Sequence, residues 1–313
     1  FDNNELVPPL RYGDTAFQQH FNTIASWGFN SVRLCIDKLN ISDISRFFKS
    51  LDRVLCAAKN AGLKVMLLIS PPMDDAQIQF TKTIMHRYSQ SATVWAYDMM
   101  NEPLYFDPVP DRPKTDAIKI VNQWRILRDT YAPHQLFTIG FAEPIEVFEW
   151  DASLLPVDFI EIHTYHPLRV VNEMYWYGKY CGKPWMVGET SLPADGDSIA
   201  YNKEGIYMAE TMSAAVANGA IGYGWWEYAD HPYGVNFEAK YSGILDNRQQ
   251  AKFDVASIIS QFKNETPYRA PYHSCNYYNM LAYSNICIHG IIIDSDNGTP
   301  IEGAVIRGWN DDW

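Results

Sequence analysis

Short apolar runs alternate with amphipathic stretches over most of the chain. The apolar runs lack strict polar alternation, which is typical of strands buried on both faces of a sheet. We expect strands at 29–36, 63–70, 93–100, 135–141, 157–163, 184–189 and 221–228. Apolar residues that recur every three or four positions predict helices at about 15–27, 43–61, 75–90, 115–131, 170–181, 202–218 and 249–263.

Buried strands that alternate with helices predict a parallel sheet covered by helices. Seven such strands are one short of a closed (β/α)8 TIM barrel, which is the α/β fold that we predict. Its first strand would lie in or before the proline-containing segment 4–13 and would be degenerate or missing. An open doubly wound sheet is the alternative, but no expected strand is followed by the G-x-G-x-x-G turn of a nucleotide site.

The pattern changes after residue 263. Residues 264–285 are irregular and rich in polar and aromatic side chains, which favours a linker or a wrapping segment. Residues 286–313 alternate around an Asp-Asn-Gly turn, which predicts a β-hairpin. With the barrel at 1–263, this gives three parts. The segment "GTPIEGAVI" makes the last part resemble the opening of a β-sandwich similar to the carboxypeptidase regulatory domain. About one hairpin is present, so we expect either a module that is cut short or a hairpin that packs on the barrel.

Composition excludes some classes of partner. The chain has 37 acidic and 25 basic side chains, and a net charge of -12 argues against binding nucleic acid or an anionic membrane. No apolar run approaches the ~20 residues of a membrane span. Aromatic residues make up 14% of the chain, which suits sugar binding as well as core packing. We expect Cys35 and Cys56 to be buried, and we leave open whether Cys275 and Cys287 pair.

Polar residues gather where the expected strands end. In a parallel barrel these ends form the active site. The positions are occupied by Arg33, Asn101, Glu102, His163, Tyr165, Glu189 and either Trp225 or Trp226. Two glutamates on separate strands are what glycoside hydrolysis requires, because one carboxyl donates a proton while the other attacks the sugar or activates water. His163 and His166 lack a third ligand at suitable spacing, so we expect no metal.

Several segments in order carry a family resemblance. The segments "MNEP", "FIEIHTYHP", "KPWMVGET" and "GYGWWEYAD" resemble the retaining β-glycosidases on (β/α)8 barrels, most nearly glycoside hydrolase family 5, which includes cellulases and β-mannanases. "WGFNSVRL" and "YSGILDN" are similar to further landmarks of that family, and the resemblance covers roughly residues 12–263. It implies a retaining hydrolase of β-glucan or β-mannan type that needs no cofactor.

The resemblance also implies roles for single residues. Glu102 would be the general acid/base and Glu189 the nucleophile. Arg33 would keep Glu189 ionised, Tyr165 would donate a hydrogen bond to Glu189, and His163 would line the same subsite. The resemblance further assigns Asn101 to the substrate 2-hydroxyl and Trp226 to the platform under the sugar. We prefer Trp226 to Trp225 because adjacent strand residues face opposite ways.

One position departs from the family pattern. Many members end the third strand with a histidine, where this chain reads "LLISPPMDD". Ser70 and Pro71 do not replace an imidazole, which weakens a standard cellulase assignment and leaves mannanase-like branches open. Trp176 and Trp185 are candidates for outer subsites, and the segment 230–234 is a candidate cleft wall.

Two other interpretations stay open beside the hydrolase. One is a catalytically silent barrel that binds glycans, and the other is a different α/β enzyme whose strand-end glutamates are incidental. For the hydrolase we expect an oligo- or polysaccharide substrate, a monomer, and an extracellular, periplasmic or cell-surface location. The particular sugar, the linkage and endo or exo action stay open.

Overall fold

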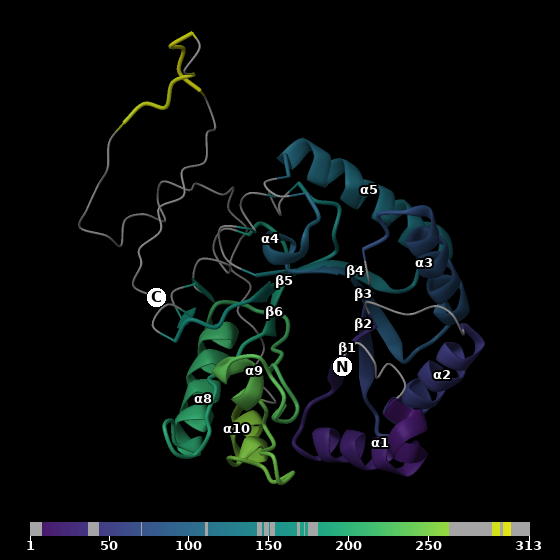
Figure 1. Cartoon of the computed structure of the whole chain (residues 1–313), viewed down its shortest axis with the longest axis vertical. Helices are drawn as coiled ribbons and strands as arrows, with labels where there is room; N and C mark the ends of the chain where they lie inside the picture. The colour runs from purple at the N-terminus through teal and green to yellow at the C-terminus, as the bar shows by residue number, and fades with distance from the viewer. Residues whose placement is uncertain are drawn as a thin grey trace.

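The computed structural model describes residues 8–36, 44–69, 71–109, 112–142, 146, 150, 154–167, 170–171, 173–174, 181–262, 290–294 and 297–301. Within them, six strands form one parallel sheet in which neighbours along the chain are neighbours in space (Figure 1). The strands are β1 (Ser31–Cys35), β2 (Lys64–Leu68), β3 (Val94–Asn101), β4 (Leu136–Phe141), β5 (Ile160–His163) and β6 (Trp185–Glu189). This arrangement is a partial (β/α)8 barrel, as the sequence predicts.

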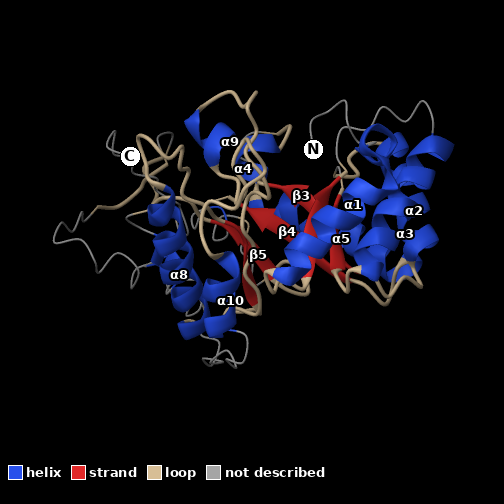
Figure 2. Ribbon diagram, turned by 90° about the horizontal axis from the view of Figure 1, so that it is seen from below, coloured by secondary structure: helices blue, strands red, loops and turns tan. Residues whose placement is uncertain are grey.

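Helices cover the outside of the curved sheet (Figure 2). The longer ones are α1 (Pro8–Ser26), α2 (Ile44–Asn60), α3 (Asp75–Tyr88), α5 (Lys114–Tyr131), α8 (Tyr201–Ala217) and α10 (Val255–Phe262). Two short helices, α4 (Pro103–Phe106) and α9 (Phe237–Tyr241), lie together at the top of Figure 2. Because α4 directly follows β3, this is the end of the sheet where the strands have their carboxyl termini.

The sequence pattern explains how these elements pack. Strand β2 buries almost its whole length, with Val65 and Leu67 fully inaccessible, as expected for a strand between two layers of side chains. Helix α2 places its apolar face, which includes Phe47 and Leu51, on the same core. Helix α3 begins with a capping box between Asp74 and Gln77.

The first and the last segments of the barrel sequence differ from expectation. Helix α1 starts at Pro8, so the segment 8–13 is helical and contains no degenerate first strand, and residues 1–7 lie outside the described residues. The predicted helix at 249–263 is shorter, because α10 begins only at Val255. Before it, the Asp246 side chain accepts backbone hydrogen bonds from Arg248 and Gln250, which holds a turn instead.

The segment 221–228 runs beside β6 without forming a regular strand. It makes one parallel bridge, between Val187 and Tyr223, and the Gly224 amide donates to the Val187 carbonyl over 2.7 Å. Gly224 lies so close to the backbone of β6 that a Cβ atom would stand 2.2 Å from the Gly188 carbonyl oxygen. The segment therefore occupies the place of the eighth strand, although the predicted regular strand is wrong.

Some expectations for single residues are also wrong or fall outside the described chain. Cys56 is exposed on α2 rather than buried, and Cys35 is half-buried. Trp185 is a core residue of β6 with 2% of its surface accessible, so it does not line an outer subsite. Ser70, Trp176, Cys275, Cys287 and the linker 264–285 lie outside the described residues.

The carboxyl-terminal segment is described only in part. Its described residues include one antiparallel bridge between Ile293 and Pro300, with the Ile301 amide donating to the Ile292 carbonyl. The division of the chain into three parts stays a prediction. Among the helices that the structure describes, none combines the length and the apolar composition needed to cross a bilayer.

Candidate active site

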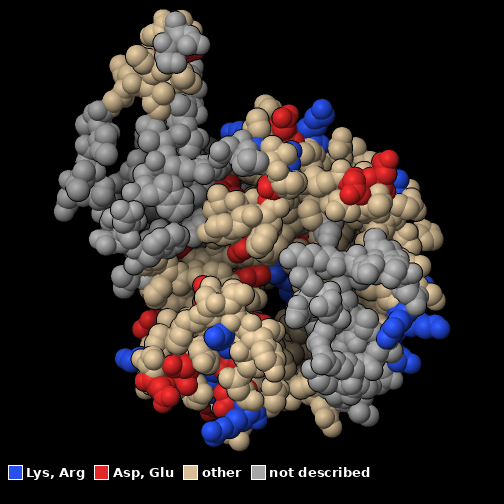
Figure 3. Space-filling view, viewed as in Figure 1, with Lys and Arg blue, Asp and Glu red and all other residues tan. Residues whose placement is uncertain are grey.

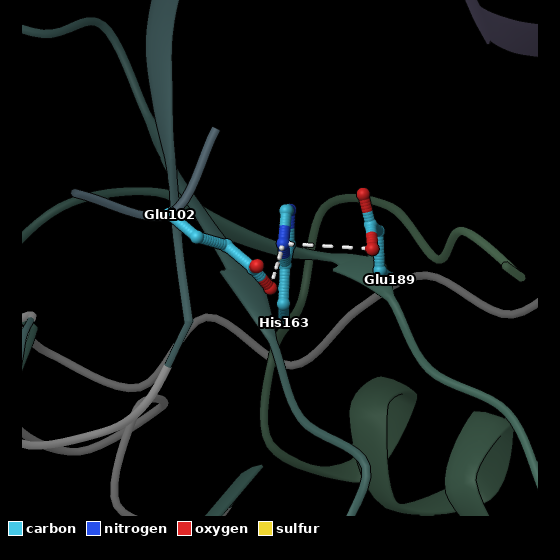
Figure 4. A group of neighbouring side chains, drawn as sticks. All are labelled: Glu102, His163 and Glu189. Atoms are coloured by element: carbon cyan, nitrogen blue, oxygen red, sulfur yellow. Dashed lines mark hydrogen bonds and ion pairs between the residues drawn. The ribbon is translucent and has the colours of Figure 1, made fainter. Parts of the chain in front are cut away.

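The carboxyl ends of β1, β3, β5 and β6 bring the predicted polar residues together. Figure 3 shows acidic side chains beside a basic one in the hollow at the middle of this face. One ligand atom each from Glu102, His163 and Glu189 lies within 4.8 Å of the other two. In Figure 4 the His163 imidazole stands between the two carboxylates. The ends of three strands therefore bring these three side chains together in one small space.

Glu102 stands at the turn where β3 ends. Its backbone is left-handed, with φ 42°, and Pro103 begins α4 directly after it. The Glu102 amide donates to the Gly140 carbonyl of β4 over 2.7 Å, which anchors the turn to the sheet. A left-handed glutamate is uncommon and costs about 1 kcal/mol or more, so the surrounding contacts must hold it there. The Glu102 side chain is 15% exposed and therefore reaches solvent in the hollow.

A second glutamate holds the chain that follows Glu102. Glu146 accepts hydrogen bonds from the Leu104 amide of α4 and, over 2.5 Å, from the Ala142 amide just after β4. Burial raises the pKa of Glu146 to about 8, although these two amide donors favour its ionised form. Glu146 thus ties the loop after Glu102 to the end of the neighbouring strand.

Glu189, the last residue of β6, is held by three groups. Arg33 donates to its Oε1, the Tyr165 hydroxyl donates to Oε2 over 2.5 Å, and His163 Nδ1 lies 3.7 Å from Oε2. Burial by itself would raise the pKa of Glu189. The charges of His163 and Arg33 and the Tyr165 hydrogen bond outweigh burial, so the pKa is lower than usual. Glu189 is therefore kept ionised and pointed into the hollow.

Arg33 organises the floor of the site. Its Nη2 donates to Asp98 Oδ2 over 2.6 Å and to Asn101 Oδ1 over 2.8 Å, and its Nε lies 3.2 Å from Glu161 Oε1. Burial disfavours the charged guanidinium, but Glu161, Asp98 and Glu189 outweigh it and hold the pKa of Arg33 well above its usual range. The planar fork suits this task because it contacts several carboxylates at once.

Asp98 and Glu161 are fully buried beneath Arg33. Asp98 Oδ1 also accepts from the Gly140 amide over 3.1 Å. Burial and, to a lesser extent, Glu161 raise the pKa of Asp98 to about 7, although Arg33 opposes them. Sequence reasoning missed both residues. A detectable signal was present for Glu161, which precedes His163 by two positions and therefore shares its face of β5.

His163 is buried and has acidic neighbours on both sides of its ring. Its Nδ1 lies 2.9 Å from Glu102 Oε1, and its Nε2 lies 3.8 Å from Glu161 Oε1. Burial would lower the pKa of His163, but Glu189, Glu102 and Glu161 raise it to about 10 against the opposing charge of Arg33. The ring therefore holds a proton readily next to Glu102.

Two glycines make room for these side chains. A Cβ atom at Gly188 of β6 would lie 2.2 Å from the Glu161 carboxylate. A Cβ atom at Gly140 of β4 would lie 2.8 Å from His163 Nε2 and 3.3 Å from Arg33 Nη2. Since neighbouring side-chain atoms do not tolerate such distances, the buried charged layer requires glycine at both positions.

The two neighbouring tryptophans lie in different surroundings. The Trp226 ring packs edge-on against Tyr165, with centroids 6.1 Å apart, and so belongs to the site. The Trp225 ring packs against Tyr207 and Phe253 in the core, and its Nε1 donates to the Ser242 carbonyl over 3.0 Å. The peptide bond between Trp226 and Glu227 is cis.

One ligand atom each from Glu102, His163 and Glu189 would be close enough to share a metal ion. However, both oxygens of Glu189 already accept hydrogen bonds, one from Arg33 and one from Tyr165. Arg33 and His163 also place positive charge beside these ligand atoms, whereas a metal ion needs neutral or negative ligands. We therefore assign no metal to these residues.

Comparison with known proteins supports this description. Residues 5–126 match the model of the family described as Cellulase (glycosyl hydrolase family 5). This range includes β1 to β3 and hence Arg33, Asn101 and Glu102. The sequence matches no curated protein. The resemblance to this family that the motifs suggest is thereby confirmed.

Several solved structures share the fold. An exo-β-1,4-mannosidase from Opitutaceae bacterium strain TAV5 aligns with a TM-score of 0.66 at 18% identity, over 82% of this chain and 57% of that chain. The catalytic domain of the major endoglucanase from Xanthomonas campestris pv. campestris aligns with a TM-score of 0.57 at 14% identity, over 79% of this chain and 88% of that one. The chain therefore spans little more than half the length of the mannosidase.

A family 1 β-glucosidase from Thermotoga maritima also aligns, with a TM-score of 0.57 at 12% identity, over 81% of this chain and 87% of that one. At these identities the structural likeness shows the (β/α)8 barrel fold. Together with the family match, the fold supports a glycoside hydrolase.

Proposed function

We propose that the protein is a retaining β-glycoside hydrolase that acts by double displacement. The observation that carries this proposal is the closeness of the two glutamates, whose carboxylate oxygens approach within 4.8 Å. Retaining enzymes separate their carboxyl groups by ~5 to 5.5 Å, whereas inverting enzymes need ~6.5 to 9.5 Å to fit a water. The shorter spacing leaves no room for that water.

In the first step Glu189 attacks the anomeric carbon and Glu102 gives a proton to the leaving oxygen. Arg33 and Tyr165 support attack because they hold Glu189 ionised and fixed in one orientation. The glycosidic bond breaks as the bond between sugar and Glu189 forms, and the leaving group departs as an alcohol.

In the second step Glu102 takes a proton from water, which attacks the anomeric carbon and releases Glu189. Glu102 thereby regains the proton that it gave away, so the enzyme returns to its starting state. Asn101 lies beside Glu102, with its Nδ2 3.3 Å from Glu102 Oε2, and this position supports a role for Asn101 in binding the substrate 2-hydroxyl. Trp226 offers its ring to the face of the sugar.

The proposed substrate is an oligo- or polysaccharide of β-glucan or β-mannan type. The match to the cellulase family supports a β-linked glucan, and the departure at Ser70 and Pro71 keeps a β-mannan in view. Such polymers lie outside cells, so we propose an extracellular, periplasmic or surface location and action as a monomer. The alternative is a silent barrel that binds the same glycans without cleaving them.

The deciding experiment is incubation with 2,4-dinitrophenyl 2-deoxy-2-fluoro-β-glucoside and with the corresponding β-mannoside. The fluorine slows both steps and the good leaving group speeds the first one, so the glycosyl enzyme accumulates. We expect one added sugar on the peptide that contains Glu189, detected by mass spectrometry. The sugar that labels faster identifies the configuration that the site prefers.

A matched pair of variants tests the two roles. Glu102→Gln should still be labelled, because the dinitrophenyl group leaves without a proton, yet its turnover of natural glycans should fall by about 10²- to 10⁴-fold. Glu189→Gln should not be labelled at all. Absence of label with both sugars, together with unchanged turnover in Glu102→Gln, would refute the hydrolase. Glycan binding without turnover would instead support the silent barrel.

A further inference from the structure

Three buried polar atoms belong to the neighbouring side chains of His163 and Glu161. The Nε2 atom of His163 and both carboxylate oxygens of Glu161 have no hydrogen-bond partner among the described residues. His163 Nε2 and Glu161 Oε1 lie 3.8 Å apart, and both side chains are fully buried. A buried donor or acceptor without a hydrogen bond costs about 1–3 kcal/mol. Glu161 Oε1 forms an ion pair with Arg33 Nε at 3.2 Å but no hydrogen bond, so the unbonded His163 Nε2 beside it points to an interaction between them.

Glu161 is built into this position by the fold. It precedes His163 by two residues on β5, so both side chains lie on the same face of the strand. Gly140 and Gly188 leave the space that the two side chains fill, since a Cβ atom at either position would overlap one of them. Arg33 Nε lies 3.2 Å from Glu161 Oε1 and forms an ion pair with it.

We propose that Glu161 is a positioning residue that keeps a hydrogen on Nε2 of His163, so that the proton between His163 Nδ1 and Glu102 is the one exchanged during catalysis. The interaction needs only a shift of about 0.9 Å to reach ordinary hydrogen-bond length. Glu161 touches neither the substrate nor the reacting atoms. It acts through His163 on the general acid/base, and in this respect the inference rests on the proposed function.

The proton balance follows from the two ring nitrogens. With Nε2 carrying its hydrogen toward Glu161, the Nδ1 lone pair faces Glu102 Oε1 at 2.9 Å. One proton then occupies that gap, on Glu102 or on Nδ1. In the first step it passes from Glu102 to the leaving oxygen, and in the second step the attacking water returns one proton to Glu102. His163 is neutral while the proton is on Glu102 or has been given away.

Other charged groups also act on the His163 ring. From neighbouring strands and loops these are Arg33, Asp98, Glu102, Glu146 and Glu189, in addition to Glu161 on its own strand. Arg33 is the opposing positive charge, and the others favour the bound proton. Among these acids, Glu161 alone is placed at ion-pair distance from Nε2, so its removal should change the proton on that nitrogen in particular.

Two variants separate charge from hydrogen bonding. Glu161→Gln keeps a carbonyl oxygen that accepts from Nε2 but loses the negative charge, and Glu161→Met loses both. Removing a negative charge at this distance should release the shared proton more easily. We therefore expect the alkaline limb of the kcat/KM profile to move to lower pH by about one unit in Glu161→Gln and further in Glu161→Met. A lower rate at all pH values with an unmoved limb would overturn the proposal.

A second readout does not depend on activity. In protein labelled with ¹⁵N-histidine, the His163 signals are assigned as those missing from His163→Asn among the eight histidines. In the unmodified protein we expect Nε2 to carry a hydrogen across the pH range in which the protein is folded. An unprotonated Nε2 at neutral pH would overturn the proposal even if the enzyme were active. If no glycoside is cleaved, the proposed function fails while this measurement still tests Glu161.

Glu204→Gln is the matched control. Glu204 is as fully buried as Glu161, and it lies near Lys252 and Asp230; in the described part of the chain it forms no hydrogen bond or ion pair with His163 or Glu102. Loss of its carboxyl should leave the alkaline limb and the His163 signals in place. If the control moves the limb as far as Glu161→Gln does, the effect comes from general loss of buried charge and the proposal is wrong.

Discussion

The barrel contains two buried clusters of charge, and they differ in access to solvent. In the site cluster, Arg33 and His163 face the carboxyl groups of Asp98, Glu102, Glu161 and Glu189. In the second cluster, Lys252 Nζ lies 2.7 Å from Asp230 Oδ1 and 3.4 Å from Glu204 Oε2. Arg33, Glu102 and Glu189 are 12–16% exposed in the hollow, whereas Lys252, Asp230 and Glu204 are at most 1% exposed.

Both clusters contain more acids than bases, and each therefore favours a bound proton. Burial raises the pKa of Glu204 to about 9, although Lys252 lies nearby. In the sealed cluster such a proton only neutralises charge. In the site cluster the acid excess stands at the wall of a hollow, so its proton can reach a substrate. Similar electrostatics therefore serves packing in one place and chemistry in the other, and access to the hollow decides which.

The largest expected effect is the loss of the nucleophile from the open cluster. Glu189→Gln should lower kcat on the order of 10⁴-fold or more, as nucleophile removal does in other covalent enzymes. It should also lower thermal stability, because the lowered pKa of Glu189 means that its ionised form stabilises the folded state through Arg33, His163 and Tyr165. Steady-state hydrolysis of an aryl glycoside and a thermal melt measure both. If Glu189→Gln is inactive because it is unfolded, the open cluster serves packing as the sealed one does.

The next effect concerns the cation of the open cluster. Arg33→Lys keeps the charge but loses the fork that contacts Asp98, Asn101 and Glu189 together. We expect kcat to fall about 10²-fold through displacement of Glu189, and unfolding free energy to fall by about 1–3 kcal/mol through lost buried hydrogen bonds. Denaturant unfolding and single-turnover kinetics separate these two losses. Retention of full activity would show that the fork does not position the nucleophile.

The sealed cluster should respond in stability alone. Lys252→Met leaves Asp230 without its ion-pair partner in a buried place, which costs about 3–5 kcal/mol of unfolding free energy. Activity per folded molecule should not fall in proportion, since Lys252 contacts none of the site residues. Denaturant midpoints and active-site titration with the fluoro sugar check this expectation. A loss of labelled fraction without a loss of stability would contradict it.

The last prediction concerns how stability depends on pH. The folded pKa of Glu204 is raised, so between about pH 4.5 and 9 the folded state holds a proton that the unfolded chain has released. This contribution is fully present below the unfolded pKa and is lost as pH rises through about 9. Glu204→Gln should remove this part of the slope, at most about 1.4 kcal/mol per pH unit. Urea unfolding at several pH values measures this slope. If the unfolding free energy depends on pH equally in the unmodified protein and in Glu204→Gln, the raised pKa of Glu204 is refuted.

The sequence reveals most of the fold because the strands are apolar and the helices amphipathic. The predicted strand 63–70 contains β2, and the predicted helix 43–61 contains α2. The short helices α4 and α9 were not predicted, since a single turn of helix leaves no periodic signal. The segment 221–228 was misjudged because its glycines allow a close backbone approach that no hydrophobic pattern reports.

For the site, strand ends indicated the residues that face the hollow but not those beneath them. Asp98 precedes Asn101 by three positions, which in a regular strand would place the two on opposite faces. The pairing of β3 with β4 shifts register between them, and both side chains contact Arg33. The rule that alternate residues of a strand share a face therefore failed here, because the strand has an irregularity that only the structure shows.

Gly140 and Gly188 have a practical consequence for protein engineering. Programmes that seek heat-resistant variants often replace glycine with alanine to restrict the unfolded chain. At these two positions one added methyl group would push against Glu161, or against His163 and Arg33. Such a library would discard its activity while leaving every carboxylate in place, so screening should exclude both sites from the start.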